Sequence, residues 1–342
     1  MAVSDAPDLA DLTTLRLGGP AAELVEAHDE DRLVEAVRSA DESGTPVLVV
    51  GGGSNLVVAD EGYDGRVVVV RNVGLRSEGD TCGGAYVEVG AGESWDDVVA
   101  TAVDRGWVGI EALAGIPGTT GATPIQNVGA YGQEVSQTLA RVRTWDRLLK
   151  GVRTFAAADC GFGYRTSRFK QDPGRHVVLS VTFQLTLGDL GAPVRYAELA
   201  RALGVEIGDR APAAAVREAV LGLRRGKGMV LDPDDHDTWS TGSFFTNPVV
   251  PAAEVPEGAP TWPQADDLVK TSAAWLIERA GFTKGYGNDR VRLSSKHTLA
   301  ITNRGSARTS DVLDLAREIR DGVRERFGIE LVNEPVLVGC AL

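Results

Sequence analysis

The stretch Val47-Leu48-Val49-Val50-Gly51-Gly52-Gly53-Ser54-Asn55 joins a short apolar strand directly to a glycine loop. Consecutive glycines leave their backbone N–H groups bare, and such a loop can hydrogen-bond an extended anion such as a pyrophosphate. Ser54 and Asn55 add side-chain donors. The spacing matches neither GxGxxG nor a P-loop with its Lys-Ser/Thr pair. Taken alone, the loop is interpreted equally well as a tight turn between strands.

The elements around this loop predict a compact α/β unit, followed by a longer region richer in strands. Asp29 to Gly44 carries apolar residues on one face and ends in Gly, which indicates a helix. The final helix, residues 311–327, has apolar residues at spacings of three and four. Further helices are expected at residues 94–102, 212–224 and 272–280, the first of them capped by the Ser94 side chain. Further strands are expected at residues 57–58, 67–70, 86–89, 142–145, 177–185 and 298–302.

Composition excludes several classes of protein. The chain has 342 residues, so two or three domains are expected. Its net charge is −13 and its pI about 4.9, and this acidic balance argues against nonspecific binding to nucleic acid or to an anionic membrane. The three cysteines, Cys82, Cys160 and Cys340, are far apart and only four His are present, so neither a disulfide framework nor a metal site is expected. Residues 1–11 do not resemble a secretory signal, and no apolar run reaches the ~20 residues of a membrane span. We expect a cytoplasmic protein.

A second glycine-rich stretch, Gly109 to Gly132, reads GIEALAGIPGTTGATPIQNVGAYG. It is poor in helix formers, too apolar for a linker, and longer than most connections, which indicates a functional loop. Together with the first loop it could clamp one extended anionic cofactor from two sides, with Gln126 and Asn127 bonding a ring edge or ribitol. The structural alternative is an Ω-type loop.

Four further motifs carry candidate functional residues. Gly163 to Phe169, GYRTSRF, places Arg165 among aromatic residues, an arrangement suited to a carboxylate or phosphate, although a surface Arg lying on a Tyr would look the same. Arg224 to Gly228, RRGKG, suits a diphosphate, or simply the end of a helix. Gly242 to Pro248, GSFFTNP, sets Ser243 beside two aromatics, where it is either a proton donor or a turn residue. Glu334 is a single acid in an apolar C-terminal strand, and such a carboxyl usually has a basic partner or a chemical role.

These motifs, together with SAAWLIERAG and the C-terminal NEPVLVG, occur in an order that resembles the UDP-N-acetylenolpyruvoylglucosamine reductase (MurB) family over nearly the whole chain. The resemblance implies an α+β fold, with a vanillyl-alcohol-oxidase-type FAD-binding fold of two subdomains and a smaller substrate domain. The expected segments are residues 1–73 and 74–226 for FAD, 227–328 for substrate, and 329–342 for a strand with the catalytic acid. The implied reaction is NADPH-dependent, FAD-mediated reduction of an enolpyruvyl sugar nucleotide in cell-wall precursor synthesis, by a monomer.

The resemblance also assigns roles to residues. It makes Arg165, Ser243 and Glu334 catalytic, with Ser243 as the proton donor. The candidate FAD contacts are Gly51, Gly52, Gly53, Ser54, Asn55, Gly115, Ile116, Pro117, Gly118, Gly121, Ala122, Gln126, Asn127, Gly129 and Arg224. The candidate substrate contacts are Tyr164, Tyr196, Lys227, Asn247, Lys270 and His297, with Tyr196 closing over the sugar nucleotide as in the long-loop subtype.

The chain departs from the family pattern at three places. Thr246 stands where many members have Lys, and Asn333 precedes the acid where Pro is common. The insertion 232–241 lengthens the connection between Lys227 and Ser243. Two other functions remain open: an alcohol or phenol oxidase on the same flavin fold, distinguished by reoxidation in air, and a non-catalytic nucleotide-binding protein, distinguished by the absence of flavin colour.

Overall fold

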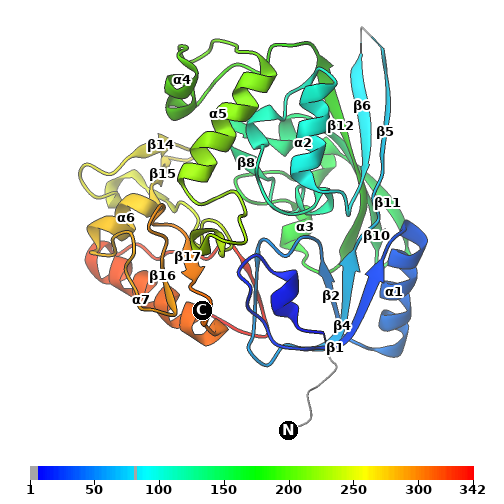
Figure 1. The fold of residues 1–342 in the computed structure, drawn as a ribbon, viewed down its shortest axis with the longest axis horizontal. Helices are drawn as coiled ribbons and strands as arrows, with labels where there is room; N and C mark the ends of the chain where they lie inside the picture. The colour runs from blue at the N-terminus through cyan, green and yellow to red at the C-terminus, as the bar shows by residue number, and fades with distance from the viewer. Residues whose placement is uncertain (1–6, 81–82) are drawn as a thin grey trace. The chain divides into compact units, whose positions relative to one another are not determined.

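The computed structural model describes residues 7–80 and 83–342, apart from the side chain of Asp80. Residues 1–6, part of the segment in which no signal is expected, and Cys82 lie outside it. The chain forms two compact units, whose elements are labelled in Figure 1. Unit 1 comprises Met1–Ala21, Gly53–Tyr63 and Lys227–Leu342, and unit 2 comprises Ala22–Gly52 and Asp64–Gly226.

Unit 2 contains two sheets and a short hairpin. The smaller sheet has the order β1-β4-β2, with β2 and β4 parallel, and consists of β1 (Ala21–Ala27), β4 (Tyr63–Val70) and β2 (Val47–Val50). The larger sheet is antiparallel in the order β11-β10-β12-β6-β5, with β7 also on β12. Its strands are β5 (Leu75–Asp80), β6 (Gly84–Gly90), β7 (Trp107–Val108), β10 (Leu139–Asp146), β11 (Gly151–Ala156) and β12 (His176–Leu187). The hairpin is β8 (Gly129–Ala130) with β9 (Gln133–Glu134).

The helices of unit 2 begin and end where capping chemistry allows. In α1 (Glu30–Ser43), Asp29 accepts a hydrogen bond from Arg32 N at 2.7 Å, and Gly44 ends the helix with φ 72°. α2 (Trp95–Asp104) and α5 (Ala213–Gly226) contact each other beside the larger sheet (Figure 1). The remaining helices are α3 (Arg168–Gln171), α4 (Ala197–Leu203), and the 3₁₀ turns η2 (Glu111–Leu113), η3 (Thr120–Ala122), η4 (Val135–Gln137) and η5 (Ala157–Cys160).

Unit 1 brings the start of the chain together with its end. β3 (Leu56–Val58) pairs in parallel with β18 (Val336–Val338), so that the strand after the glycine loop lies beside the C-terminal strand. Two small antiparallel sheets complete its β-structure: β13 (Val249–Pro251), β15 (Leu268–Thr271) and β14 (Thr261–Pro263), and β16 (Val291–Leu293) with β17 (Ile301–Asn303). Its helices are α6 (Ala273–Arg279), α7 (Thr309–Phe327), and the 3₁₀ turns η1 (Leu9–Leu12), η6 (His236–Thr238) and η7 (Ala252–Glu254).

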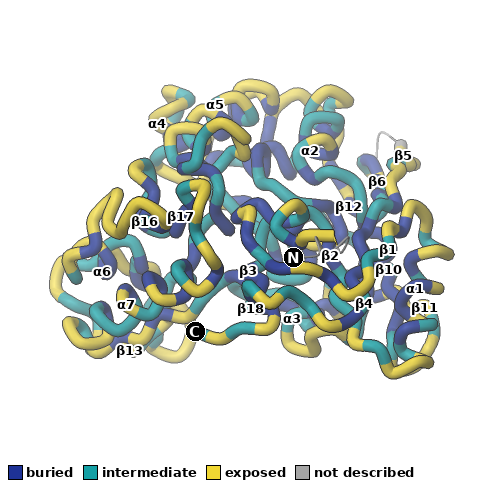
Figure 2. Tube along the Cα trace, turned by 60° about the horizontal axis from the view of Figure 1, so that its bottom comes forward, coloured by how far each residue is buried: buried dark blue, intermediate teal, exposed yellow. Residues whose placement is uncertain are grey.

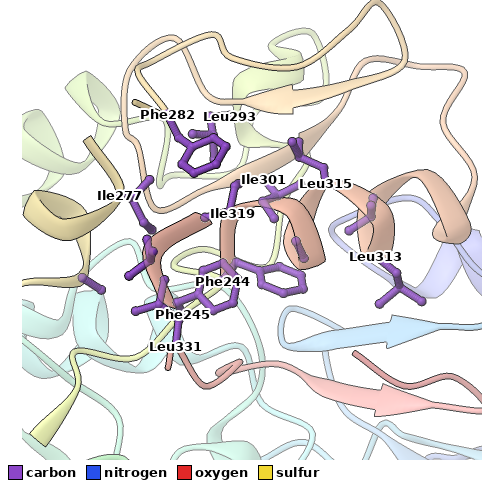
Figure 3. Close-up of a cluster of buried hydrophobic side chains, with 14 of the residues drawn as sticks. Phe244, Phe245, Ile277, Phe282, Leu293, Ile301, Leu313, Leu315, Ile319 and Leu331 are labelled. Atoms are coloured by element: carbon purple, nitrogen blue, oxygen red, sulfur yellow. The ribbon is translucent and has the colours of Figure 1, made fainter. Parts of the chain in front are cut away.

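The core of unit 1 gathers around the buried face of α7. Val312, Ile319 and Val323 are fully buried, as their helical spacing predicts. Phe244 and Phe245 belong to the same cluster, and Figure 3 shows them close to Leu331. Along α7 the trace alternates between buried and exposed residues, and Figure 2 shows the same pattern on the other long helices.

Most predicted elements are confirmed within a few residues, including every predicted helix. Two details are wrong. Ser94 occupies the N-cap position of α2, but its side chain makes no capping hydrogen bond. The strand expected at 298–302 is β17 (Ile301–Asn303), because residues 294–300 form a turn in which Ser294 N donates to Ala300 O at 2.8 Å.

The two units differ from the four contiguous segments expected from the sequence. The expected segments and the observed units both divide the chain between residues 226 and 227. However, unit 1 also includes residues from the expected first FAD segment, because β3 pairs with β18. The functions of the four segments stay predictions. In the part of the chain that the structure describes, no helix has the length and apolarity to cross a membrane.

Candidate active site

The two glycine-rich loops meet in unit 2. A Cβ on Gly51 would lie 2.3 Å from Thr119 Oγ1, and one on Gly52 would lie 2.6 Å from Gly118 Cα. No side chain fits at either position, so these glycines let one loop pack directly on the other. The sequence predicted that the loops work together, and within unit 2 Gly51 and Gly52 contact the second loop.

Close packing against protein atoms, and not only the approach of a ligand, explains why these positions are glycine. A Cβ at Gly53, which has φ 60°, would fall 1.8 Å from Leu12 O, and one at Gly121 would fall 2.6 Å from Ala91 Cβ. At each of these positions the obstacle is protein, so the absence of a side chain is explained before any ligand is considered. Gly115, with φ 69°, is held by its N–H, which donates to Asp96 Oδ1 at 2.6 Å.

The end of the second loop is an ordered network centred on Asn127. Asn127 is 1% exposed and has φ 47°. Its Nδ2 donates to Glu134 Oε2 at 2.8 Å and to Gly163 O at 3.1 Å, while its Oδ1 accepts from Ser136 N at 3.1 Å. This side chain is therefore used within the protein, and we interpret Asn127 as a support for its neighbours. Of the other residues predicted on this loop, Ile116, Pro117, Gln126 and Gly129 are half-buried and Ala122 is exposed.

Arg165 lies in a tight turn that this network holds. Gly163 and Thr166 form an isolated antiparallel bridge, and Arg165 between them has φ 52°. Its Nη2 donates to Gly129 O at 2.9 Å, and its guanidinium carbon lies 5.7 Å from the centre of the Tyr164 ring. Ser167, fully buried, donates to Ile125 O at 2.5 Å and anchors the next residues. The turn and its hydrogen bonds thus hold the Arg165 guanidinium in a fixed position relative to the backbone.

Arg168, the second Arg of this motif, has a structural role. Its guanidinium carbon lies 4.3 Å from the centre of the Phe155 ring, and its Nη1 donates to Asp159 O at 2.7 Å. Arg168 thus lies on an aromatic ring, which is the structural arrangement given above as the alternative to an anion-binding Arg, although the ring is that of Phe155 and not of a Tyr.

Arg224 places a positive charge inside unit 2. Its residue is only 8% exposed, in the last turn of α5. Burial lowers the pKa of Arg224 to about 10, against the opposing effect of Tyr131 and Asp96. The side chain stays protonated at neutral pH, because its pKa remains well above 7. A buried guanidinium in a chain of net charge −13 suits a bound diphosphate, and this donor chemistry fits a flavin dinucleotide.

In unit 1, the backbone brings Ser243 and Glu334 to the same place. Glu334 N donates to Phe244 O at 2.8 Å, and Phe245 pairs with Asn333 in an antiparallel bridge. Phe244 and Phe245 are each 1% exposed and fix this crossing in the core. Both Ser243 and Glu334 are half-buried beside it. Residues 91 positions apart in the sequence thus lie on segments that meet at one crossing.

The glycine loop also reaches this crossing through its last residue. Asn55 O accepts from Val336 N at 2.9 Å, and Asn55 Nδ2 donates to Glu334 O at 3.4 Å. Asn55 therefore supports the segment that carries the predicted acid. Glu334 lies just before β18 and not within a strand as the sequence suggested, because the strand begins only at Val336. On the other side, Phe244 N donates to Leu299 O at 2.7 Å, which places the segment after His297 beside Ser243.

The insertion 232–241 is anchored tightly just before Ser243. Asp237 accepts from Ser295 Oγ at 2.5 Å, from Ser295 N at 3.0 Å and from Arg304 Nη1 at 3.2 Å. Trp239 O accepts from Asn303 N at 3.0 Å, and the Arg16 guanidinium carbon lies 4.3 Å from the Trp239 ring centre. The insertion is thus part of the folded unit and holds the chain that leads to Ser243.

The predicted substrate contacts are distributed over both units. In unit 1, Asn247 Oδ1 accepts from Ala273 N at 3.0 Å at the start of α6, and Lys270 Nζ lies 5.9 Å from the centre of the Trp262 ring. Lys227 and His297 are half-buried. In unit 2, Tyr164 is half-buried and Tyr196 is 45% exposed. A surface hollow of about 340 Å³ beside Tyr286 and Glu318 contains none of the predicted residues.

Comparison with known proteins identifies the family. Residues 21–149 match the model of an FAD binding domain, and residues 232–338 match that of the UDP-N-acetylenolpyruvoylglucosamine reductase C-terminal domain. A UDP-N-acetylenolpyruvoylglucosamine reductase of Cutibacterium acnes is 58% identical over 98% of this chain and 90% of its own length. The chain belongs to the UDP-N-acetylenolpyruvoylglucosamine reductase family. A Streptomyces avermitilis protein of the same name is 57% identical over 99% of this chain and 95% of its own length.

A solved structure extends the agreement to three dimensions. The UDP-N-acetylenolpyruvylglucosamine reductase of Thermus caldophilus superposes with a TM-score of 0.67 at 27% identity, covering 98% of both chains. The predicted resemblance, the FAD-binding α+β fold and the enzyme class are therefore confirmed. The chain is an FAD-dependent oxidoreductase of the UDP-N-acetylenolpyruvoylglucosamine reductase family.

Sequence reasoning missed several residues that organise the site of this reductase. Tyr131 and Gly132 form the turn between β8 and β9, both with positive φ, at 49° and 86°. Asp237 anchors the insertion, and Glu111 is a fully buried acid in η2. The X-Gly pair at 131–132 is a hairpin signal that could have been recognised. No sequence motif marks Asp237 or Glu111, because most of their partners lie far away in the sequence.

Proposed function

We propose that this chain catalyses the NADPH-dependent, FAD-mediated reduction of UDP-N-acetylglucosamine enolpyruvate to UDP-N-acetylmuramate. The relatives named for this reductase activity support the substrate, at 58% and 57% identity over nearly their whole length. The reaction belongs to peptidoglycan precursor synthesis. It needs only small-molecule partners, so we propose a monomer acting in the cytoplasm.

The candidate FAD contacts named from the sequence would hold the cofactor. The backbone of the two packed glycine loops would approach FAD, and Arg224 would offer its charge to the diphosphate. When bound, FAD would supply the hydride chemistry that links NADPH, through flavin N5, to the vinyl carbon of the substrate. The protein residues must then stabilise the charge that develops and supply one proton.

Arg165 and Glu334 are the groups proposed to stabilise this charge. Negative charge develops on the substrate carboxylate as the vinyl carbon gains hydride, and a positioned cation binds that charge more strongly than it binds the ground state. Arg165 is suited to this role because its turn and its bond to Gly129 O hold the guanidinium. Glu334 would donate a hydrogen bond to the same carboxylate in its protonated form.

Ser243 is the proposed proton donor to the carbon next to the reduced one. The observation that carries this proposal is the 2.8 Å hydrogen bond from Glu334 N to Phe244 O, which joins the Ser243 segment to the Glu334 segment within unit 1. With Phe244 buried, neither segment can move independently. The two side chains are therefore presented from one rigid crossing.

The test separates the two half-reactions. We expect Ser243→Ala to leave flavin reduction by NADPH at the wild-type rate, because that step needs no proton from Ser243. Reoxidation by the enolpyruvyl sugar nucleotide should slow at least ~10²–10⁴-fold, the contribution of a positioned acid. Stopped-flow absorbance of the flavin measures both rates. The matched control is Ser306→Ala, at an exposed Ser of the same unit, which should change neither.

Three results would contradict the proposal. Equal slowing of both half-reactions would remove the assigned role of Ser243. Rapid reoxidation of the wild-type flavin by air alone would favour an alcohol or phenol oxidase. A purified protein without flavin absorption that binds only nucleotide would indicate a non-catalytic binding protein.

A further inference from the structure

Glu111 is a fully buried acid that the proposed chemistry does not use. It begins the 3₁₀ turn η2 and has 0% exposure. A buried carboxylate is costly unless hydrogen bonds compensate for lost water. Here Oε1 accepts from Gln133 Nε2 at 2.8 Å and from Ala192 N at 2.6 Å, and Oε2 accepts from Gly109 N at 2.6 Å. The carboxylate is satisfied by protein groups alone.

The three donors belong to three separate segments of unit 2. Gly109 is the first residue of the second glycine-rich stretch, Gln133 lies in β9 of the hairpin, and Ala192 follows β12. The other atom of the Gln133 side-chain amide is also bonded, since Gln133 Oε1 accepts from Ala112 N at 2.8 Å. The fit at the third segment is tight, because a Cβ on Gly191 would lie 2.7 Å from Glu111 Oε1.

Ala192 lies in the neck of an excursion that carries Tyr196. The chain leaves at residue 189 and returns at residue 213, and backbone bonds close the neck: Gly191 N to Ala211 O at 2.9 Å and Ala213 N to Asp189 O at 2.8 Å. Beyond the neck lie Tyr196 and helix α4. Glu111 therefore binds the excursion at its base, a short distance along the chain from the exposed Tyr196.

The hairpin β8–β9 touches the same excursion farther out. The ring centres of Tyr131 and Tyr196 are 5.4 Å apart in an edge-to-face arrangement. A Cβ on Gly132 would lie 2.8 Å from Arg195 Cβ, so the two backbones also approach closely. One hairpin thus meets the excursion twice, through Gln133 and Glu111 at the neck and through Tyr131 at Tyr196.

We propose that Glu111 is a positioning residue for Tyr196, holding the 189–213 excursion at the register that sets the Tyr196 ring against Tyr131. This inference rests on the proposed function, in which Tyr196 contacts the sugar nucleotide. Glu111 touches neither substrate nor cofactor in this scheme. It acts through the neck, because a shift of Ala192 relative to Gln133 would move Tyr196 away from the hairpin.

The main test replaces one carboxylate oxygen by an amide group. In Glu111→Gln, the new NH2 cannot accept a hydrogen bond. At the Oε2 position it would unpair Gly109 N, and at the Oε1 position it would unpair both Ala192 N and Gln133 Nε2. We expect the KM for the enolpyruvyl sugar nucleotide to rise about tenfold, the effect of one hydrogen bond to a charged group. The rate of flavin reduction by NADPH should stay within about twofold of wild type. Glu206→Gln, at an exposed Glu in the same excursion, is the matched control and should change neither.

A second variant tests the neck without touching the carboxylate. Gly191→Ala places a methyl group against Glu111 Oε1, and Gly191 does not have a positive φ that would strain Ala. The same rise in KM is expected. It serves as the test if Glu111→Gln loses flavin or folds poorly.

A double-mutant cycle separates positioning from general stability. If Glu111 acts through Tyr196, Glu111→Gln should change KM less than about twofold in a Tyr196→Ala background. Effects that multiply in the double variant would overturn the proposal. So would an unchanged KM in both Glu111→Gln and Gly191→Ala.

Limited trypsin digestion distinguishes failure of this proposal from failure of the proposed function. Arg195 is exposed, and its cleavage should become at least about threefold faster in Glu111→Gln if the neck is loosened. A wild-type enzyme without activity on the enolpyruvyl sugar nucleotide would refute the proposed function, whatever the digestion shows. If the wild type is active but cleavage at Arg195 is unchanged in both Glu111→Gln and Gly191→Ala, the role of Glu111 is refuted and the proposed function is not.

Discussion

Asn127, Tyr131 and Arg165 share a backbone conformation that side chains rarely adopt. Their φ values are 47°, 49° and 52°. Each such residue costs on the order of 1–3 kcal/mol unless its surroundings hold it in place. Hydrogen bonds from Asn127 to Gly163 O and from Arg165 to Gly129 O link two of these strained positions to neighbouring turns. The strain therefore accompanies the residues to which we assign support and charge stabilisation.

At the same scale, Asp237 predicts a pH dependence of stability. Burial raises the pKa of Asp237, but hydrogen bonds from Ser295 and the charge of Arg304 outweigh burial and bring the pKa below its ordinary value. A lowered folded-state pKa means that the carboxylate stabilises the fold fully above the unfolded value of about 3.9. The stabilisation is lost as the pH falls through the lower folded value.

Asp237→Asn should therefore lower the free energy of unfolding by about 1–3 kcal/mol at pH 7. The difference from wild type should stay constant down to about pH 4 and narrow below it. Urea unfolding between pH 7 and pH 3 measures the difference. Asp234→Asn, at an exposed Asp of the same insertion, should have a negligible effect. A difference that widens on acidification would show that the sign is wrong.

At the scale of elements, the hairpin β8–β9 connects more parts of unit 2 than its length suggests. Gly129 O accepts from Arg165, Gln133 bonds Glu111, and Tyr131 contacts Tyr196. Its two turn residues both have positive φ, the pattern of a type I′ turn, which matches the twist of the paired strands. Such a turn sets where the flanking side chains point.

Comparing Gly132→Ala with Gly44→Ala should separate the cost of placing Ala at positive φ from the effect of the contact with Arg195. Both Gly132 and Gly44 have positive φ, but a Cβ on Gly44 meets nothing within 4 Å, whereas one on Gly132 lies 2.8 Å from Arg195 Cβ. Each change to Ala should cost about 1–2 kcal/mol of unfolding free energy for the left-handed backbone, and Gly132→Ala should cost more because of its contact with Arg195. Only Gly132→Ala should also raise the KM for the sugar nucleotide, because it pushes the Tyr196 segment away. Equal KM values in the two variants would contradict this interpretation.

At the scale of the whole molecule, neither unit is a continuous piece of chain. Unit 1 joins residues 227–342 to two segments from the first 63 residues. These segments supply β3 as the partner of β18, and Leu15, Leu17 and Val57 to the same core cluster as Phe244. The C-terminal portion that carries Ser243 and Glu334 thus depends on the start of the chain.

A fragment of residues 227–342 should consequently not fold cooperatively. Without the first 63 residues, β18 loses its partner strand and the core loses buried apolar area at about 25 cal/mol per Å². Circular dichroism during urea titration should show a gradual change for the fragment, while the full-length chain shows a cooperative transition. A sharp transition in the fragment would show that residues 227–342 are sufficient.

The sequence by itself determined most helices and strands, because apolar periodicity and caps act within a few residues. Asp29, Gly44 and the apolar face of α7 predict their helices through local contacts. The ordered motifs also determined the family, since each carries its own residue pattern. The assignment of Ser243 and Glu334 came from those motifs as well.

Only the tertiary structure decided how distant residues combine. Three contacts join segments that are far apart in sequence: the pairing of β3 with β18, the crossing of Phe244 with Glu334, and the bond of Ala192 to Glu111. It also decided why Gly51 and Gly52 are glycines: each faces the second loop at a distance that excludes a side chain. The physical reason is that packing and hydrogen bonding depend on distance in space, and a single sequence reports local propensity only.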